Sequence, residues 1–277
     1  MIKADLHTHS NFSDGILSPE DLILKASNCG LQIISITDHD TMKYGRTLID
    51  FAKENGVTLI PGIELTTLHK GGNIHLLGYF KDDSYTDSIF QDNLYFLQTK
   101  RMERAKKMVD NLKEFYNIII DFQHLIHSSN SLIARPHIAK AIIEAGYNYT
   151  FTELFDSVLS KKSKAYIPNF GLTLEEGIQL LHKYNAITVI AHPTLMRSNS
   201  IEDLMDMPFQ GIEAIYPQNK PLETEKFIAL AEAHNKLYTA GSDYHGINGD
   251  IKHGAMGDYT LTGSALERFL QCLNAKV

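Results

Sequence analysis

Short apolar runs alternate with amphipathic helical patterns over most of the chain. Residues 2–6 form the first run, and the next segment, SPEDLILKASNCG, has helical periodicity with Ser18 as the expected N-cap and Gly30 at its end. Further apolar runs are LQIISITDHD, VTLIPGIEL, NIHLLGYF, AITVIAHP, GIEAIYP and LYTAGSDYH. This alternation is typical of parallel βα units, and it predicts seven strands.

The alternation is interrupted between about residues 81 and 165. This stretch contains the helical patterns FLQTKRMERAKKMVDNLKEF and RPHIAKAIIEAG, and it lacks a run typical of a parallel strand. We therefore predict an α/β fold with a closed or nearly closed (β/α)7 barrel formed by residues 1–80 and 166–277. Residues 81–165 are expected to be a helical insertion after the fourth strand that covers the active site. An open doubly wound sheet is the alternative, and the absence of a Gly-rich phosphate loop after the first strand counts against it.

Histidines and carboxylates recur at the carboxyl ends of the predicted strands, where parallel barrels carry their catalytic groups. Six of the seven strand ends have them, and the exception is the strand that ends near Tyr216. The residues concerned are His7, His9, Asp14, Asp38, His39, Asp40, Glu64, His75, His192, Asp243 and His245. Taken singly, each is compatible with a hydrogen-bonded loop residue, and His75 with a core histidine. Taken together they indicate a metal cluster, because such groups are costly to bury unpaired.

The motif HTH shows how the first ligands would be placed. Residues two apart on a strand project to the same face, so His7 and His9 can both reach one ion. Nitrogen and oxygen ligands without thiolate suit zinc, manganese or iron. Glu64 is well placed to bridge two ions. Such a cluster makes hydroxide available near neutral pH and stabilises the attacking and leaving oxygens of a phosphoryl transfer.

The motifs DLHTHSNFSDG, TDHD, PGIE, IHLLGY, AHP and GSDYHG resemble the successive motifs of the PHP (polymerase and histidinol phosphatase) family of metal-dependent phosphoesterases. The resemblance covers both ends of the chain and implies a distorted seven-stranded (β/α) barrel. It also implies two to three divalent ions, Mn²⁺, Zn²⁺ or Fe²⁺. The implied catalytic residues are His7, His9, Asp40, Glu64, His192 and Asp243.

The resemblance further implies how the ligands are divided among the ions. The first ion would be held by His7, His9, Glu64 and Asp243, the second by Glu64, His75 and His192, and the third by Asp14, His39 and His245. Some branches of the family have a histidine where Asp14 stands, so we expect the third site to be weaker or to prefer another metal. Asp38 or Asp40 would orient the ligands.

Two arginines and a histidine are candidates for binding substrate phosphate. Arg135 and His137 precede a predicted helix, whose free N–H groups suit phosphate, and Arg197 follows His192 within loop reach. RPHIA together with AHP…R resembles the PHP branch that acts on nucleotides and short RNA, where such arginines bind phosphate. The alternative for Arg135 is that it braces the insertion.

This resemblance implies hydrolysis of nucleoside monophosphates, 3′,5′-bisphosphates or 5′ ends of short oligonucleotides by a metal-bound hydroxide. The run KRMERAKK is interpreted as a solvated helix face, and a track for an RNA backbone is the sharper alternative.

Composition narrows the possible partners. A formal charge of −7 argues against a protein that coats long duplex nucleic acid, although a small phosphorylated substrate remains compatible with it. Two cysteines do not make a disulfide framework, and no apolar run is long enough for a membrane span. We therefore expect a cytoplasmic protein without membrane contact. The oligomeric state is left open.

Three other functions are compatible with the motifs. Histidinol-phosphate phosphatase uses the same chemistry, but the RPHIA insertion speaks against it. A metal-dependent amidohydrolase also begins its barrel with HxH, but it normally bridges its metals with a strand-borne lysine or an equivalent group, whereas Glu64 stands at this place here. A non-catalytic metal-binding module is the third alternative, and the intact ligand set argues against it.

Overall fold

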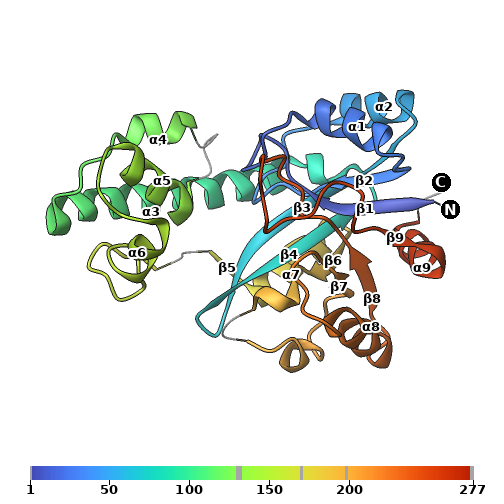
Figure 1. Ribbon diagram of the computed structural model, residues 1–277. Coiled ribbons are helices and arrows are strands. Elements are labelled where there is room, and N and C mark those ends of the chain that lie inside the picture. Colours follow the sequence, from blue (N-terminus) through green and yellow to red (C-terminus); the bar gives the residue numbers. More distant parts are fainter. Residues whose placement is uncertain (1, 129–132, 169–170, 197–198, 275–277) are drawn as a thin grey trace. The chain divides into compact units, whose positions relative to one another are not determined.

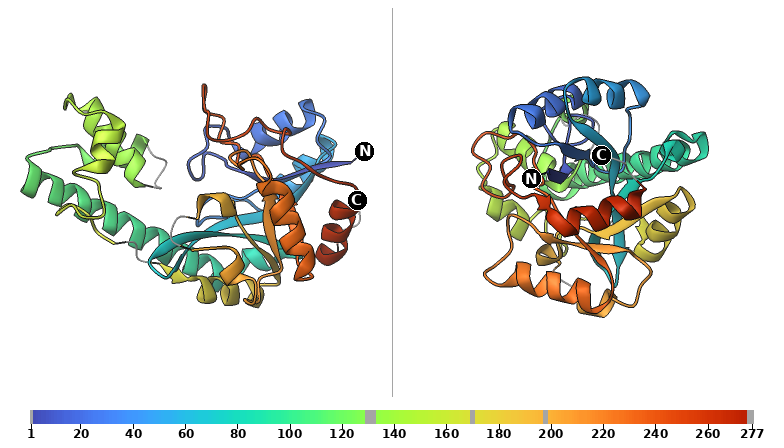
Figure 2. Two further views of the ribbon diagram at one scale, coloured as in Figure 1. Left: turned by 60° about the horizontal axis from the view of Figure 1, so that its bottom comes forward. Right: turned by 90° about the vertical axis from the view of Figure 1, so that its right-hand side faces the viewer.

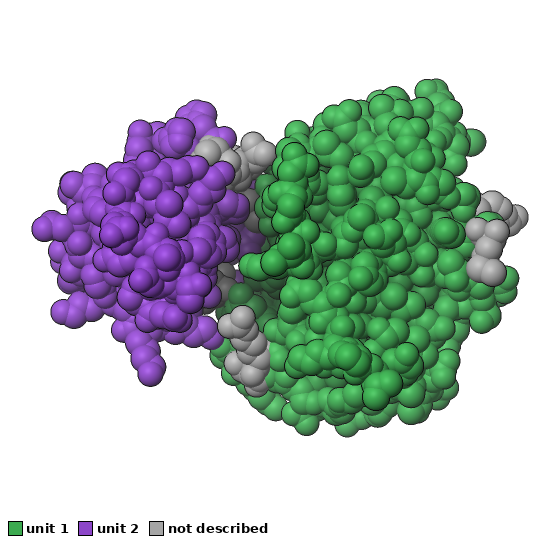
Figure 3. Space-filling model, viewed as in Figure 1, with its two compact units in different colours: residues 1–92, 172–277 green, residues 93–171 purple. Residues whose placement is uncertain are grey.

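The computed structural model describes residues 2–128, 133–168, 171–196 and 199–274. The chain divides into two compact units, which Figure 3 colours separately: residues 1–92 with 172–277, and residues 93–171. We call them unit 1 and unit 2. The insertion was expected at residues 81–165, and unit 2 spans residues 93–171. That the insertion covers the active site stays a prediction.

Unit 1 is built on one strongly curved sheet (Figure 1). Its strand order is β8-β7-β6-β4-β3-β2-β1-β9, and β5 pairs with β3. The strands are β1 (Lys3–Thr8), β2 (Ile33–Ile36), β3 (Thr58–His69), β4 (Gly72–Phe80), β5 (Leu172–Thr173), β6 (Ala186–Ile190), β7 (Gly211–Ile215), β8 (Leu237–Ala240) and β9 (Leu261–Thr262). A bridge between Thr8 and Tyr244 joins the segment after β8 to β1. The predicted barrel-like α/β fold is therefore confirmed, and the seven predicted strands are accompanied by β5 and β9.

The fourth predicted strand, β4, runs in the direction opposite to the one expected. β4 is antiparallel to both of its neighbours, β3 and β6, whereas parallel units were expected. β3 does not end at Glu64 but continues to His69, and a two-residue turn leads directly into β4. Both turn residues, Lys70 and Gly71, have positive φ (45° and 77°), as the tight turns of β-hairpins require. Because β4 starts at the end where the parallel strands finish, His75 near its start lies at the same end as their carboxyl termini.

Helices cover the outer face of this sheet. They are α1 (Pro19–Asn28), α2 (Arg46–Glu54), α7 (Leu174–Lys183) and α8 (Glu223–Ala233), whereas α9 (Gly263–Leu273) packs on β8 and β9 and contributes to the interior core. α7 packs on β3, β4 and β6, and α8 packs on β7 and β8 (Figure 1). The expected caps are present: Ser18 Oγ accepts the Asp21 N–H (3.1 Å), and Thr173 and Glu176 form a capping box.

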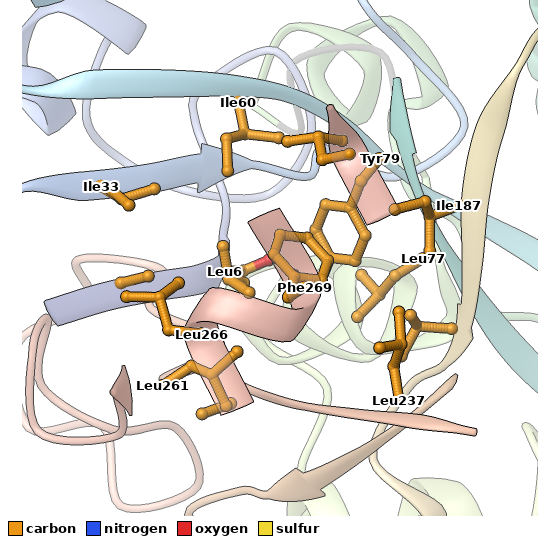
Figure 4. Packing of buried hydrophobic residues seen from close by; sticks show 14 of the residues in the cluster. Leu6, Ile33, Ile60, Leu77, Tyr79, Ile187, Leu237, Leu261, Leu266 and Phe269 are labelled. Atoms are coloured by element: carbon orange, nitrogen blue, oxygen red, sulfur yellow. Dashed lines mark hydrogen bonds between the residues drawn. The ribbon is translucent and has the colours of Figure 1, made fainter. Parts of the chain in front are cut away.

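A buried apolar cluster fills the interior of unit 1. Tyr79 of β4 and Phe269 of α9 lie at its centre, with ring centroids 5.2 Å apart in an edge-to-face arrangement (Figure 4). The Tyr79 hydroxyl donates to the Leu6 carbonyl (2.9 Å), so its polar end is satisfied inside the core. α9, coloured red in Figure 2, thus ties the end of the chain to the first strand through β9 and through this cluster.

Unit 2 is helical and has its own apolar core. α3 (Ser88–Tyr116) begins in unit 1 and continues into unit 2, where α4 (Phe122–Ser128), α5 (Arg135–Glu144) and α6 (Phe151–Asp156) follow. The core includes Met108, Leu112, Ile138, Ile142 and Leu154, all of them buried. The two helical patterns seen in the sequence correspond to α3 and α5. Within the described ranges, no helix is long and apolar enough to cross a membrane.

We expect Phe269→Ala to lower the free energy of unfolding by about 3–5 kcal/mol, because it leaves a cavity against Tyr79. The measurement is denaturant unfolding followed by circular dichroism. Phe115→Ala, at a position that is 45% exposed, is the control and should cost less than about 1 kcal/mol. Equal losses in the two variants would contradict a structural role for α9 in closing the core.

Candidate metal centre

All nine residues predicted as metal ligands lie together at one end of the unit 1 sheet. They come from the end of β1 and the loop after it, the loop after β2, β3, β4, and the segments that follow β6 and β8. The residues are His7, His9, Asp14, His39, Glu64, His75, His192, Asp243 and His245. No side chain of unit 2 is needed to form this group.

The first group of ligand atoms consists of one ring nitrogen from each of His7 and His9 and one carboxylate oxygen from each of Glu64 and Asp243. The Nε2 atoms of His7 and His9 are 3.1 Å apart. Asp243 Oδ1 lies 3.0 Å from His9 Nε2 and 3.4 Å from His7 Nε2, and Glu64 Oε2 lies 3.3 and 3.4 Å from the same two nitrogens. His7, His9 and Glu64 are almost completely buried. Four ligand atoms from four residues thus converge, as expected for the first ion.

The second group surrounds the other oxygen of Glu64. Oε1 lies 2.8 Å from His75 Nδ1 and 3.0 Å from His192 Nε2. The two oxygens of Glu64 therefore face different sets of histidines, which is the arrangement a bridging carboxylate needs. His39 Nδ1 lies 3.0 Å from Glu64 Oε2, the oxygen that also faces His7 and His9, so His39 contacts the first group as well as the third one.

The third group is formed around Asp14. Its Oδ1 lies 3.2 Å from His245 Nε2 and 3.5 Å from His9 Nδ1, and its Oδ2 lies 3.6 Å from His39 Nε2. The ligand atoms of these four residues lie within 4.8 Å of one another. His9 faces the first group with Nε2 and the third with Nδ1.

Buried polar atoms normally have a hydrogen-bond partner, and several of these ligand atoms do not have one with suitable geometry. This is what a site for a cation would show. His7 Nδ1 lies 2.9 Å from the Glu213 carboxylate, which requires an N–H there and leaves the lone pair of the neutral ring on Nε2. That lone pair faces another imidazole nitrogen and two carboxylate oxygens. Asp14 Oδ1 and His39 Nδ1 are buried, and in the part of the chain that the structure describes neither makes a contact with hydrogen-bond geometry, although His245 Nε2 and Glu64 Oε2 lie 3.2 and 3.0 Å from them. Divalent ions held by these groups would satisfy such atoms.

The electrostatics of the group point the same way. Burial opposes ionisation of Glu64 and Asp243, but the surrounding imidazoles outweigh it and hold the pKa of both carboxyls well below the usual range. Burial likewise disfavours the charged form of His9, but Asp243 and Glu64 raise its pKa to about 10. The pKa of His7 is also raised, because the carboxylates of Glu213, Asp243 and Glu64 outweigh its burial. In the metal-free protein, these raised pKa values favour protonated His7 and His9 rings beside the carboxylates.

Glu213 is a functional residue that the sequence analysis missed. It is fully buried in β7, where its Oε1 accepts from the His7 ring and its Oε2 accepts the His192 N–H (2.8 Å). A carboxylate behind a metal-binding imidazole fixes its tautomer and raises its basicity. In the sequence, Glu213 is the one charged residue within GIEAI, which is otherwise apolar. The sequence analysis considered only the end of this strand and therefore overlooked the residue in its middle.

Other buried carboxylates support the loops that carry the ligands. Asp38 accepts hydrogen bonds from the Ser10 N–H (2.8 Å) and the Ser13 hydroxyl (2.5 Å), and Asp40 accepts the Thr66 N–H (2.7 Å). Asp38 thus holds the loop after β1, and Asp40 ties the loop after β2 to β3; that either residue orients the metal ligands stays a prediction. Asp5 accepts the Ser242 N–H (2.9 Å), and burial raises its pKa to about 6.

Backbone conformation at the site is unusual in three places. Asp40, His192 and Asp243 have φ values of 50°, 29° and 52°, in the left-handed region that costs non-glycine residues energy. Two of the three are expected metal ligands. The backbone is also crowded at Gly241. A Cβ at this position would overlap the Cβ of His7 and approach Glu213 Oε1 to 2.7 Å, so only glycine fits.

Two further side chains reach this group from segments to which no role was assigned. The Tyr216 hydroxyl donates to Asp243 Oδ2 (2.9 Å). β7, the one predicted strand without a histidine or carboxylate at its end, therefore also ends beside the site. His253 stacks on His245, with ring centroids 4.2 Å apart.

Of the three residues expected to bind phosphate, Arg135 and His137 belong to unit 2. Arg197 lies outside the described residues. Arg135 begins α5, where it donates to the Leu159 carbonyl (3.2 Å) and lies over the rings of Phe155 and Tyr166. His137 Nδ1 accepts the Ala134 N–H (3.0 Å). The contacts of Arg135 brace unit 2, which was the alternative considered for it.

The run KRMERAKK belongs to α3. Lys100 pairs with Glu103 (2.9 Å) and Lys106 with Asp110 (3.3 Å), as on a solvated helix face. Arg104 differs because it is partly buried, donates to the Ile167 carbonyl (2.9 Å) and lies over the Tyr166 ring.

A barrel that gathers imidazoles and carboxylates at one end of its sheet defines a metal-dependent hydrolase. The family model of the PHP domain matches residues 5–196, more than half of the chain, and the chain therefore belongs to the PHP domain family. This result confirms the family resemblance and the class of enzyme, a metal-dependent phosphoesterase.

Three comparisons describe what the chain is similar to. It is 26% identical over 250 residues to the 5'-3' exoribonuclease Rnm of Salmonella typhimurium, covering 87% of this chain and 84% of that protein. It is 26% identical over 254 residues to a 3',5'-nucleoside bisphosphate phosphatase of Chromobacterium violaceum, covering 88% of each chain. A crystal structure from Bifidobacterium adolescentis, assigned as a metal-dependent phosphoesterase, has a TM-score of 0.80 and 26% identity over 97% of this chain and 96% of that chain.

We expect Glu213→Gln to weaken metal binding by about 10- to 100-fold without unfolding the protein. The amide keeps the shape of the side chain but has only one acceptor oxygen, whereas the carboxylate accepts from both His7 and His192. Affinity would be measured by competition with a chromogenic chelator. Glu232→Gln, at an exposed position on α8, is the matched control. An unchanged affinity in Glu213→Gln would mean that this carboxylate does not support the ligands.

Metal binding to the metal-free protein should release protons. His7 and His9 have raised pKa values and therefore keep protons at neutral pH, whereas Glu64 and Asp243 are already ionised. Ligands bind metal in their deprotonated form, so the apparent affinity should rise about tenfold per pH unit for each proton released. Isothermal titration in buffers of different ionisation enthalpy measures this number. Binding heats that do not depend on the buffer would contradict the expectation.

Proposed function

We propose that this phosphoesterase hydrolyses phosphate esters of nucleotides, either nucleoside monophosphates and 3′,5′-bisphosphates or the 5′ ends of short oligonucleotides. The observation that carries the proposal is the convergence of His7, His9, Glu64 and Asp243 on one point, with Glu64 turned toward His75 and His192 as well. The substrate class is supported by the two relatives at 26% identity, an exoribonuclease and a nucleoside bisphosphate phosphatase.

The proposed ligand sets follow the three groups of atoms. His7, His9, Glu64 and Asp243 would hold one ion, Glu64, His75 and His192 a second, and Asp14, His39 and His245 a third. The chemistry that such ions supply when bound is the activation of water and the neutralisation of charge on the phosphate. Mn²⁺, Zn²⁺ and Fe²⁺ suit this set of nitrogen and oxygen ligands.

The side chains around the ligands would carry out the positioning that the reaction needs. Glu213 holds the His7 ring with Nε2 toward the centre, and Asp40 fixes the backbone at Thr66, two residues beyond Glu64 on β3. Tyr216 donates to Asp243 Oδ2 and so fixes the rotation of that carboxylate. These contacts keep the ligands in one geometry and reduce the reorganisation required during the reaction.

Arg135, His137 and Arg197 are proposed to bind the substrate phosphate. Arg135 uses one terminal nitrogen for Leu159, and its fork has five donors in total, so bracing and phosphate binding are compatible. Arg135 stands at the N-terminus of α5, where the positive end of the helix dipole also favours an anion. His137 accepts from the Ala134 N–H with Nδ1, which places its own proton on Nε2.

The alternatives are separated by their substrates. A histidinol-phosphate phosphatase would release phosphate from histidinol phosphate but not from nucleotides. An amidohydrolase would act on neither, and a binding module would take up metal without turnover.

The test is phosphate release by the manganese-loaded protein from AMP, adenosine 3′,5′-bisphosphate, histidinol phosphate and a short 5′-phosphorylated RNA. Turnover of the nucleotides or RNA is expected, with loss on chelation and recovery on adding metal. His9→Ala should abolish it. Arg135→Ala should lower kcat/KM by about 10- to 100-fold, the cost of a lost charge-assisted hydrogen bond. Lys140→Ala, on the same helix but exposed, is the matched control and should retain activity.

Thermal unfolding of Arg135→Ala distinguishes bracing from binding. A variant that melts like the parent protein but binds nucleotide poorly supports the phosphate role. Turnover of histidinol phosphate alone would overturn the substrate assignment and leave the metal chemistry intact.

A further inference from the structure

A pocket of about 450 Å³ lies at the end of the unit 1 sheet opposite the metal centre. Its lining includes Lys81, which directly follows β4, and residues at or just before the starts of β6, β7 and β8, namely Ile187, Gln210 and Leu237. The metal ligands lie where the parallel strands finish, so the two sites are separated by the length of the barrel strands. The volume falls within the range of roughly 300–1,000 Å³ that is typical of small-ligand sites.

The lining of this pocket is positively charged. Three cationic side chains contribute to it, Lys81, Lys236 and Arg268, and among the described residues no carboxylate does. This reverses the charge of the whole chain, which is −7. Two carboxylates act on the cations from outside the pocket, Asp82 on Lys81 and Asp206 on Lys236. Both oxygens of Asp82 already accept hydrogen bonds, so the cations are left to attract an anion.

Hydrogen-bond donors remain available on two of the polar side chains. Arg268 donates one N–H to the Asn235 carbonyl (3.2 Å) and so uses one of the five donors of its guanidinium. Gln210 Oε1 accepts from the Thr188 N–H (2.8 Å) and hydroxyl (2.6 Å) and lies 3.0 Å from His182 Nε2. Because a backbone N–H can only donate, this contact fixes the orientation of the Gln210 amide. The amide nitrogen, with its two N–H groups, is then the atom left for a ligand.

The remaining lining combines a fixed charge with an apolar wall. Lys236 Nζ donates to the carbonyls of Met207 (2.8 Å) and Phe209 (2.6 Å), and it lies 4.0 Å from the centre of the Phe209 ring. An ammonium group has three donors, so these contacts leave one. Pro208, Phe209 and Leu237 supply apolar surface beside it. A ligand that fills the pocket therefore needs an apolar part as well as negative charge.

We propose that this pocket binds an organic phosphate monoester of mononucleotide size. The phosphate would interact with Lys81, Arg268 and Gln210, and the ring system of the ligand would lie against Pro208 and Phe209. A phosphate monoester carries nearly two negative charges at neutral pH and offers three acceptor oxygens, which matches the cations and the amide donors. A ligand held here is out of reach of the metal centre, so it is bound without being hydrolysed. This site is separate from the one assigned to the proposed function.

The test uses a cysteine that lines the pocket, Cys272, as its reporter. The chain has one other cysteine, Cys29, which is exposed, does not line the pocket and serves as the internal control. The full-length protein is alkylated with iodoacetamide at increasing concentrations of the phosphonate analogue of AMP, which cannot be hydrolysed at the metal centre. Peptide mass spectrometry gives the rate at each cysteine. The Cys272 rate should fall hyperbolically and yield a Kd, because only the unoccupied pocket reacts, whereas the Cys29 rate should not change.

Substitutions test the role of the cations. Lys81→Gln and Arg268→Gln should each raise this Kd about tenfold, the cost of a lost charge-assisted hydrogen bond. Both positions are exposed, so the variants are expected to fold, which circular dichroism checks. Lys53→Gln, at an exposed position on α2, is the matched control and should keep the parent's Kd.

Two further ligands separate the parts of the proposed interaction. Adenosine should not protect Cys272, and inorganic phosphate should do so only at much higher concentration than the phosphonate. Equal protection by adenosine would overturn the role of the cations, and equal protection by inorganic phosphate would overturn the role of the apolar wall. A Cys272 rate that does not respond to the phosphonate, or a Kd that is unchanged in both variants, overturns the proposal as a whole. None of these readouts involves turnover, so their failure leaves the phosphoesterase assignment unaffected, and absence of turnover leaves this site unaffected.

Discussion

The buried carboxylate of Glu64 is the constraint around which the rest of unit 1 is arranged. Its side chain is 1% exposed and lies within 3.4 Å of ring nitrogens from five histidines: His7, His9, His39, His75 and His192. A carboxylate in this position is stable only if positive charge accompanies it, since an unpaired buried charge costs several kcal/mol. Protons on the imidazoles supply that charge when metal is absent, and divalent ions supply it when metal is bound. The fold and the metal centre are therefore linked through a single side chain.

The antiparallel strand β4 is what makes this arrangement possible. A parallel fourth strand would present its carboxyl end to the site and carry His75, which is near its start, to the other end of the barrel. The tight turn at Lys70 and Gly71 reverses the chain instead, and the register then places His75 opposite Thr66, two residues from Glu64. At the far end of the same strand, Tyr79 packs on Phe269 and anchors α9. One strand thus connects the metal centre to the apolar core.

Much of the site could be predicted from sequence because strand ends are local features. HTH, TDHD, AHP and GSDYH each follow an apolar run, and parallel strands bring such ends together whatever their order in the sheet. The direction of β4 could not be predicted in this way, since an apolar run has the same pattern in either direction. Glu213 was missed because it lies inside its strand, and its importance depends on a contact with His7 that is distant in sequence.

Fine positioning in this site comes from carboxylates that face the ligands from outside. Glu213 lies behind His7, and Asp38 holds the loop that follows His9. Each of them accepts hydrogen bonds from backbone amides as well as from side chains or rings, so each ties a ligand or its loop to the backbone of the barrel. Rings held in this way cannot rotate freely, and the entropy of ordering them has been lost on folding, before any ion binds. The left-handed backbone at His192 and Asp243 persists for the same reason, because the surrounding hydrogen bonds and the converging ligands outweigh its local cost. The stability of the rest of the fold thus offsets the local cost of a geometry that serves metal binding. This geometry has to be closely defined because the buried charge of Glu64 is stable only with positive charge beside it.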